Sequence, residues 1–86
     1  MARFSLEISR TAEKQLRKIP AEGQRRLARA MLALGDEPYP SGSRKLAGHD
    51  DVFRIRVGVY RVIYSVASQR LIIVILKVGH RKDIYR

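Results

Sequence analysis

The first third of the chain changes from a hydrophobic period of two to spacings of three and four. The stretch "FSLEIS", residues 4–9, alternates apolar and polar side chains, which predicts a half-buried strand. Ser9 or Thr11 can then cap a helix that ends at Pro20. A second helix begins at this proline and runs to about Leu34, where the next residue is a glycine. Because little chain separates the two helices, we expect a two-helix hairpin.

The second half of the chain predicts three strands in succession. Residues 35–51 contain two prolines and three glycines and show no periodicity, so we expect a loop there. Residues 52–57, 59–66 and 71–78 each favour a strand. The last of the three is almost entirely apolar, which is typical of a central strand buried on both faces.

Together these elements predict an α+β fold. An N-terminal strand, a two-helix hairpin and a three-stranded antiparallel meander would form one sheet with the helices on one face. The length of 86 residues suits a single domain, residues 1–86, and the absence of cysteine excludes a disulfide scaffold. The chain begins with no signal-like segment and has no apolar run of about 20 residues, so we expect a cytoplasmic protein without a membrane segment.

The net positive charge of the chain indicates which kind of molecule it binds. Eighteen Lys and Arg against eight Asp and Glu give a formal net charge of +10, and thirteen of the cations are arginine. From Val52 to the C-terminus there are eight cations and one acid, Asp83. Such a field attracts phosphate, and guanidinium groups bind it in a two-pronged way. The expected partner is therefore RNA, DNA or an acidic protein that imitates them.

The first strand of the meander separates its cations from its apolar side chains. If Phe53, Ile55 and Val57 face the helices, Arg54 and Arg56 point together to the other face. That face is either a solvated surface or a phosphate-binding one. Arg61 on the next strand favours the phosphate-binding interpretation, because it could bring a third cation to the same face. The pattern alone does not decide whether Tyr60, Val62 and Tyr64 or the alternating set Arg61, Ile63 and Ser65 faces the helices.

The chain closes on "GHRKDIYR", which carries chemically active side chains directly after the central strand. Arg81 could stabilise the extra negative charge of a phosphorane transition state. Tyr85 could stack on a base, and His80 could move a proton, as histidine side chains commonly do in catalysis. The alternative interpretation is that these residues form a polar tail that only keeps the protein soluble. Four further cations are expected to bind RNA, namely Arg44, Lys45, Lys77 and Lys82.

Other chemistries find little support. His49 with Asp50 and Asp51 is too small a set for a metal site, and the remaining acids are scattered singly. We therefore expect no metal and no cofactor. Arginine, histidine and tyrosine without a metal suit one reaction well, in which an RNA 2′-hydroxyl attacks its neighbouring phosphate. The substrate supplies the nucleophile there, and the protein aligns it and neutralises charge.

The motifs of the second half resemble a known family. "KLAGHDDVFRIRVGVYRVIYSV" and "IIVILKVGHRKDIYR" are similar to the RelE/ParE superfamily of toxins from bacterial and archaeal toxin–antitoxin pairs, on the RelE side. The resemblance covers essentially the whole chain. It implies a RelE-like microbial ribonuclease fold and a metal-independent mRNA endonuclease, or mRNA interferase, that acts in the ribosomal A site and inhibits translation.

The resemblance also implies partners and residue roles. A small RelB-like antitoxin is expected to wrap the basic groove and to displace the C-terminal segment, and operator DNA is expected to bind only through the toxin–antitoxin complex. Arg61 and Arg81 match the phosphate and transition-state cations, and Tyr85 matches the ring that orients the substrate base. Arg54 and Arg56 stand where well-studied members carry lysine.

That difference leaves the general base open. Arginine does not lose its proton in proteins, so Arg54 and Arg56 are expected to hold phosphate and to stabilise the nucleophile. Water, His80 or ribosomal RNA would then transfer the proton. Two other functions remain open from the sequence, namely a ParE-like inhibitor of DNA gyrase without nuclease activity and a non-catalytic nucleic-acid-binding module.

Overall fold

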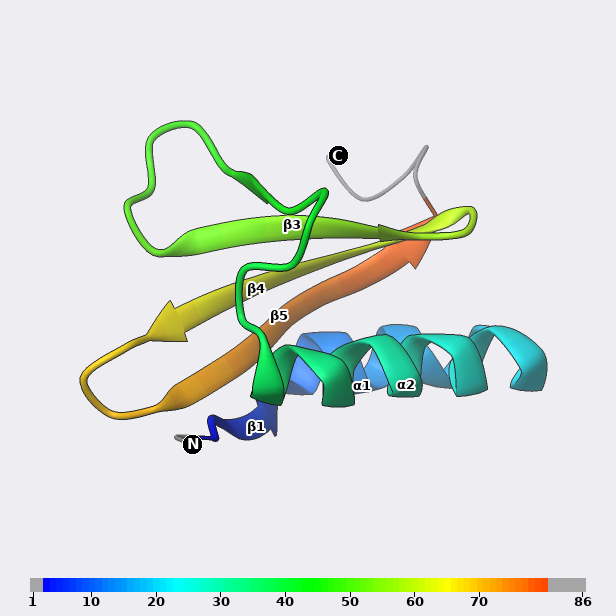
Figure 1. The fold of residues 1–86 in the computed structure, drawn as a ribbon. Coiled ribbons are helices and arrows are strands. Elements are labelled where there is room, and N and C mark those ends of the chain that lie inside the picture. The colour runs from blue at the N-terminus through cyan, green and yellow to red at the C-terminus, as the bar shows by residue number, and fades with distance from the viewer. Residues whose placement is uncertain (1–2, 81–86) are drawn as a thin grey trace.

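The computed structural model describes residues 3–80, and in them the predicted α+β fold is confirmed. Two helices and a five-stranded sheet follow the chain, with the strands in the order β1-β5-β4-β3-β2. The bounds are β1 Ser5–Ile8, α1 Arg10–Arg17, α2 Ala21–Asp36, β2 Arg44–Lys45, β3 Val52–Val57, β4 Tyr60–Ala67 and β5 Ile72–His80. Both helices lie on the same side of the sheet (Figure 1).

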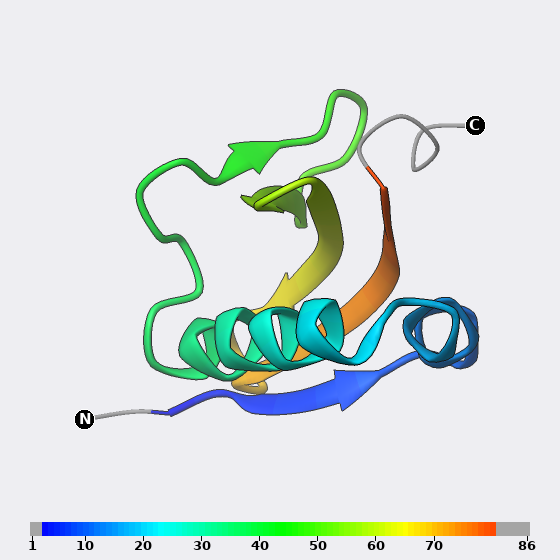
Figure 2. The same cartoon turned by 90° about the vertical axis from the view of Figure 1, so that its right-hand side faces the viewer.

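The sheet curves around the second helix. Figure 2 shows α2 lying inside the concave side, with β1 at one edge of the curve and β3 and β2 at the other. Helix α2 buries Leu27, Met31 and Leu34 on its sheet-facing side. Burying each such side chain contributes about 1.5–3 kcal/mol. The opposite, convex side of the sheet carries neither helix, and this is the side on which the cations gather.

Strand β5 is an interior strand between β1 and β4, as predicted, but it is not buried on both faces: Ile73, Ile75 and Val78 are buried, whereas Lys77 on the other face is exposed. Side chains of Ser9 and Gln15 complete its hydrogen bonding. It pairs with β1 in parallel as far as Ile8 opposite Ile75 and with β4 antiparallel along its length. Beyond the end of β1, the hydroxyl of Ser9 donates to the Leu76 carbonyl over 3.1 Å, and the Val78 N–H donates to Oε1 of Gln15 over 2.7 Å. Strand β5 is therefore hydrogen-bonded on both sides as far as Val78.

Helix boundaries differ from the predicted ones by a few residues. Ser9 caps α1 as predicted, with its Oγ accepting from the Ala12 N–H over 3.1 Å, but the helix ends at Arg17 and not at Pro20. Helix α2 continues past Gly35 to Asp36. Within residues 3–80, neither helix is long and apolar enough to span a bilayer.

The segment predicted as a loop contains a short strand. Residues 44 and 45 form β2 against Phe53 and Arg54 of β3. Two residues are too few to show a hydrophobic period, so the pattern gave no signal for this strand. Its consequence is that only the first half of β3 has a neighbour at the sheet edge.

Candidate nucleic-acid interface

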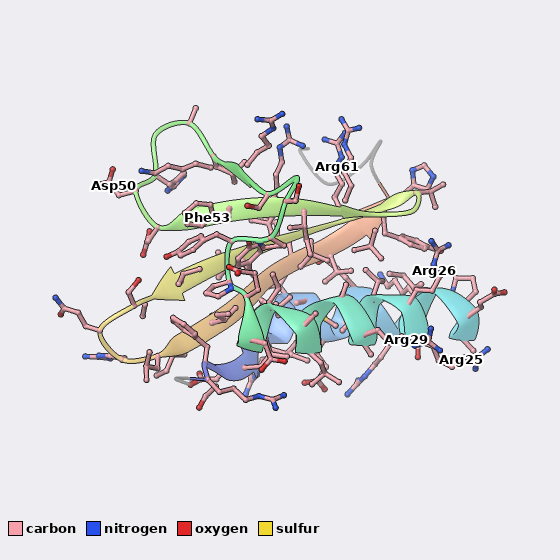
Figure 3. All side chains as sticks on the ribbon, viewed as in Figure 1. Arg25, Arg26, Arg29, Asp50, Phe53 and Arg61 are labelled. Atoms are coloured by element: carbon pink, nitrogen blue, oxygen red, sulfur yellow. The ribbon has the colours of Figure 1, made fainter. Side chains whose placement is uncertain are left out.

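Two arginines face each other across β3 and β4 on the convex side of the sheet. Arg56 pairs directly with Arg61, and paired residues of neighbouring strands share a face, with Cβ atoms about 4.5–5.5 Å apart. Their neighbours Ile55 and Val62, which are also paired, point the other way into the core. Figure 3 shows Arg61 pointing away from the two helices. The register thus settles which residues of β4 face the helices.

Three further cations share this face. Arg54 lies two residues before Arg56 on β3 and pairs with Arg44 of β2, while Lys77 of β5 pairs with Ile63. We call the set of five the outer-face cations: Arg44, Arg54, Arg56, Arg61 and Lys77. Ile63 lies between them and is only 6% exposed although no helix covers it. The aliphatic parts of the neighbouring Arg54 and Lys77 side chains can cover Ile63 while their charged ends stay in solvent.

A pocket of about 250 Å³ opens among these side chains, and it is lined by Gly42, Arg44, Arg54 and Arg56. Within residues 3–80, none of these three arginines takes part in an ion pair. The two ion pairs found there join Arg3 to Asp36 and Arg17 to Glu13. Three guanidinium groups around one solvent-filled hollow repel one another unless an anion lies between them. The pocket is therefore suited to a phosphate or a carboxylate.

No acidic side chain of residues 3–80 lines this pocket, although Glu37 lines a neighbouring hollow that Arg56 and Gly42 also border. Asp50 precedes β3 and lies at the far end of the sheet from Arg61 (Figure 3). Arg25 and Arg29 belong to α2 on the helix side, and Arg26 of the same helix reaches the β3–β4 turn, where its guanidinium group lies beside Gly58. The outer-face cations thus form a patch of one sign, and Arg25 and Arg29 lie on the other side of the sheet.

The loop that supplies Gly42 is fixed by a buried tyrosine. The Tyr64 hydroxyl donates to the Pro38 carbonyl over 2.7 Å, and the Tyr64 ring stacks on Phe53 with centroids 5.9 Å apart. Tyr39 packs edge-on against Phe53 at 5.0 Å. Burial raises the pKa of Tyr64 to about 12, because the phenolate would lose its hydration, although a hydrogen bond with Ser43 acts in the opposite direction.

This tyrosine predicts a pH dependence of stability. Because the folded-state pKa lies above the ordinary value of 10, the stabilisation is complete below pH 10 and is lost as pH rises toward 12. We expect the free energy of unfolding to fall by about 2–3 kcal/mol over this range. Urea unfolding of the wild type and Tyr64→Phe at matched pH tests it, since groups that titrate alike in both proteins cancel. Parallel pH profiles would contradict the assignment.

Two of the other residues predicted from the sequence to act in the site lie on the opposite face. His80 pairs with Tyr60, and their rings are 6.4 Å apart on the side of the sheet that carries the helices. Lys45 pairs with Phe53 and so points away from Arg44. Arg81, Lys82 and Tyr85 lie outside the described residues. The structure therefore brings together Arg44, Arg54, Arg56, Arg61 and Lys77, and it separates them from His80 and Lys45.

Two glycines belong to the interface but carried no sequence signal. Gly42 lines the pocket in a positive-φ conformation of 93°, which an L side chain rarely adopts. Gly79 lies opposite Arg61, so the outer face carries no side chain at that position of β5. The strand register identifies Gly79 and the pocket lining identifies Gly42, and neither position follows from residue type.

Comparison with known proteins gives a consistent result. A family model described as the ParE toxin of the type II toxin–antitoxin system, parDE, matches residues 6–85. The toxin RelG of Mycobacterium tuberculosis is 38% identical over 91 residues, covering 96% of this chain and 97% of the relative.

Solved structures of toxin–antitoxin complexes share the fold. The archaeal RelE–RelB complex from Pyrococcus horikoshii contains a chain that superposes with a TM-score of 0.83 at 34% identity, covering 96% of this chain and 99% of that one. A chain of the RelBE2 complex from Mycobacterium tuberculosis gives a TM-score of 0.84 at 27% identity and covers 96% of this chain and 97% of that one.

Proposed function

The chain belongs to the RelE/ParE superfamily of toxins from type II toxin–antitoxin systems, and on that premise we propose that it is a ribosome-dependent mRNA endonuclease. One observation carries the proposal. Arg56 and Arg61 are direct cross-strand partners, with Arg54, Arg44 and Lys77 around them, on a face that neither helix covers. Cations from four strands therefore surround the place where one backbone phosphate would bind.

The reaction that suits this face needs no nucleophile from the protein. The 2′-oxygen of the substrate attacks the adjacent phosphorus while the bond from phosphorus to the 5′-oxygen breaks. The products are a 2′,3′-cyclic phosphate and a 5′-hydroxyl. The proton lost by the 2′-hydroxyl passes to a base, and the leaving oxygen takes up a proton. Guanidinium groups stabilise the charge that develops on the phosphorane oxygens.

Each outer-face cation then has a role. Arg56 and Arg61 contact the scissile phosphate, and Arg54 with Arg44 holds the backbone beside it. Lys77 adds to the field from β5. Because His80 faces the helix side, we assign the proton transfers to water or ribosomal RNA. Arg81 and Tyr85, which the family resemblance implicates, remain proposed as the second transition-state cation and the base-orienting ring.

Two relationships suggest partners for this function. Several solved relatives are complexes of toxin with antitoxin, which suggests a RelB-like antitoxin that covers the cations. Contact with operator DNA would come through that complex. The family model that matches is named for ParE, so inhibition of DNA gyrase is the second candidate function.

Mapping of transcript ends on translating ribosomes tests the proposal. The wild type should cut within A-site codons, Arg81→Ala should abolish the cuts, and His80→Ala should lower the rate less than about tenfold, because its ring lies on the other face. Equal cutting by Arg81→Ala and the wild type would remove the assignment of that arginine. DNA damage without transcript cuts would support the gyrase function instead.

A further inference from the structure

A groove of about 400 Å³ opens on the helix side of β3, next to the pocket lined by Arg44, Arg54 and Arg56. Its volume falls within the range of about 300–1,000 Å³ that is usual for sites binding small molecules. Among residues 3–80, its lining includes one acid, Glu37, and a larger apolar set. The apolar lining consists of Ala30, Ala33, Leu34, Pro40, Ile55 and Val57.

The groove and the arginine pocket share two residues, because Arg56 and Gly42 line both. Strand β2 pairs only with Phe53 and Arg54, so within the described part of the chain no strand separates the two hollows beside residues 55–57. Gly42 leaves the passage open. Apart from its chain neighbours, no atom of residues 3–80 lies within 4 Å of the position that a Cβ would take there. One ligand can therefore reach from the pocket into the groove.

A nucleotide carries the two kinds of group that these hollows suit. Its phosphate matches the guanidinium groups of the pocket, which bind such anions in a two-pronged way. Its base has apolar faces, which pack against apolar side chains, and a polar edge that forms hydrogen bonds. Since the pocket is the place proposed for a backbone phosphate, the groove beside it is suited to the base of the same nucleotide.

The carboxylate of Glu37 is held in place and keeps acceptor capacity. Glu37 directly follows α2, and its Oε1 accepts from the Tyr39 N–H over 3.3 Å. A carboxylate has about four acceptor positions in all, so this bond leaves others for a ligand. Within residues 3–80, Glu37 belongs to neither of the two ion pairs. Because an ionised carboxylate only accepts hydrogen bonds, it favours a base edge that presents donors.

We propose that the groove binds one base of the RNA substrate and that Glu37 makes this subsite selective for guanine. The inference rests on the proposed function and names a base that its substrate carries near the cut. The Watson–Crick edge of guanine presents two adjacent donors, N1–H and the 2-amino group, which match the two oxygens of a carboxylate. Adenine and cytosine place an acceptor nitrogen beside their amino donor, and uracil has one N–H between two carbonyls. Each of these bases therefore turns a lone pair toward the carboxylate.

Binding of 2′-O-methyl oligoribonucleotides tests the subsite without cleavage. The oligomers carry one guanine, hypoxanthine or adenine in a run of uracils. The wild type should bind the guanine oligomer about tenfold more tightly than the adenine oligomer, and the hypoxanthine oligomer with intermediate affinity, since it lacks the 2-amino group. An oligomer with 7-deazaguanine should bind within about twofold of guanine, because only its N7 acceptor is lost. Equal affinities for guanine, hypoxanthine and adenine, or a tenfold loss with 7-deazaguanine, would overturn the proposal.

Glu37→Gln tests the residue that selects the base. Glutamine keeps an oxygen for the Tyr39 N–H, but its amide presents a donor where guanine needs an acceptor, so the preference for guanine over adenine should fall to about twofold or less. Glu22→Gln is the matched control, because Glu22 is exposed in the first turn of the same helix and lines neither hollow. This control should keep the preference of the wild type. A preference that survives in Glu37→Gln would mean that the carboxylate acts only through its charge, which would overturn the assignment.

A groove-filling variant tests where the base binds. Ala33 is exposed and lines the groove, so the indole of Ala33→Trp should take the place of the base and remove the preference for guanine. Ala28→Trp is the matched control, since Ala28 is exposed on the same helix and lines neither hollow. A preference retained in Ala33→Trp would place the base outside the groove and would contradict the proposal.

Transcript mapping separates this inference from the nuclease function. Guanine should occur at one fixed distance from the cuts made by the wild type, and Glu37→Gln should continue to cut without that enrichment. Cuts with no enrichment of guanine would refute the subsite and leave the nuclease function standing. A wild type that cuts no transcript, yet prefers the guanine oligomer in a way that depends on Glu37, would refute only the nuclease function.

Discussion

Replacement of Arg61 by alanine is expected to lower the rate of mRNA cleavage in the A site about 10²–10³-fold, the usual cost of removing one preorganised donor from a developing oxyanion. Arg61 is half-buried and pairs with Arg56, so its guanidinium group starts from a fixed position on a rigid strand. Arg61→Lys keeps the charge but loses the planar fork, and we expect about a tenfold loss. The measurement is the rate at which transcript ends appear on programmed ribosomes.

Arg70→Ala is the matched control for this prediction. Arg70 is exposed in the turn between β4 and β5, outside the outer-face cations, and its loss removes the same charge from the chain. Its cleavage rate should stay within about twofold of the wild type. Similar losses in Arg61→Ala and Arg70→Ala would mean that net charge acts from a distance and that Arg61 does not contact the reacting phosphate. Thermal unfolding of each variant excludes a loss of fold.

Alternation along a single strand was enough to predict one half of this face. In β3 three apolar residues, Phe53, Ile55 and Val57, fall on the side opposite both arginines, and the structure confirms that Ile55 faces the core while Arg56 does not. The same reasoning failed to decide β4, because both of its sets contain apolar residues. What decides is the two-residue turn, which places Tyr60 opposite Val57 and therefore Arg61 opposite Arg56. Turn length is a property of the pair of strands, and a single strand does not reveal it.

Nearness in sequence suggested that His80 belongs to the cationic site, but the fold places it on the face opposite the outer-face cations. Gly79 and His80 are neighbours at the end of β5, yet they occupy positions on opposite faces of the sheet. Gly79 lies opposite Arg61, and His80 packs near Tyr60 on the helix side. A strand separates the side chains of adjacent residues, whereas it brings together residues of different strands that lie far apart in the chain. Arg44 and Arg54 are ten positions apart and share a pocket. For a site built on strands, cross-strand register is therefore more informative than a local cluster.

The pocket and the groove depend on packing that residue patterns do not encode. Both need Gly42, whose loop is held by the bond from Tyr64 to the Pro38 carbonyl and by the rings of Phe53 and Tyr39. These contacts join segments 11 to 26 positions apart, counted from Tyr64 back to Phe53 and to Pro38. The aperiodic composition of the loop indicated only that it was irregular. The functional consequence is that a core aromatic cluster and the cationic face are parts of one arrangement.

Binding of RNA to this face should weaken about 100-fold when salt rises from 50 to 200 mM. Five cations on the outer face predict a slope of about −3.5 in a plot of log affinity against log salt, at about 0.7 for each phosphate of a single strand. A 2′-O-methyl oligoribonucleotide is the probe, because it has no free 2′-hydroxyl and therefore no nucleophile to attack. Fluorescence anisotropy across a salt series gives the slope directly.

The slope of log affinity against log salt depends on which cations contact phosphate, and not on the net charge of the chain. The double variant Arg44→Gln/Arg54→Gln should reduce its magnitude by about 1.4, since two phosphate contacts are lost. Arg25→Gln/Arg29→Gln removes the same charge from α2, on the other side of the sheet (Figure 3), and should leave the slope unchanged. If both pairs lowered it equally, RNA would be bound by the diffuse field of the whole molecule, and the convex face would be a solvated surface. A change confined to the first pair places the phosphates on β2 and β3, next to Arg56 and Arg61.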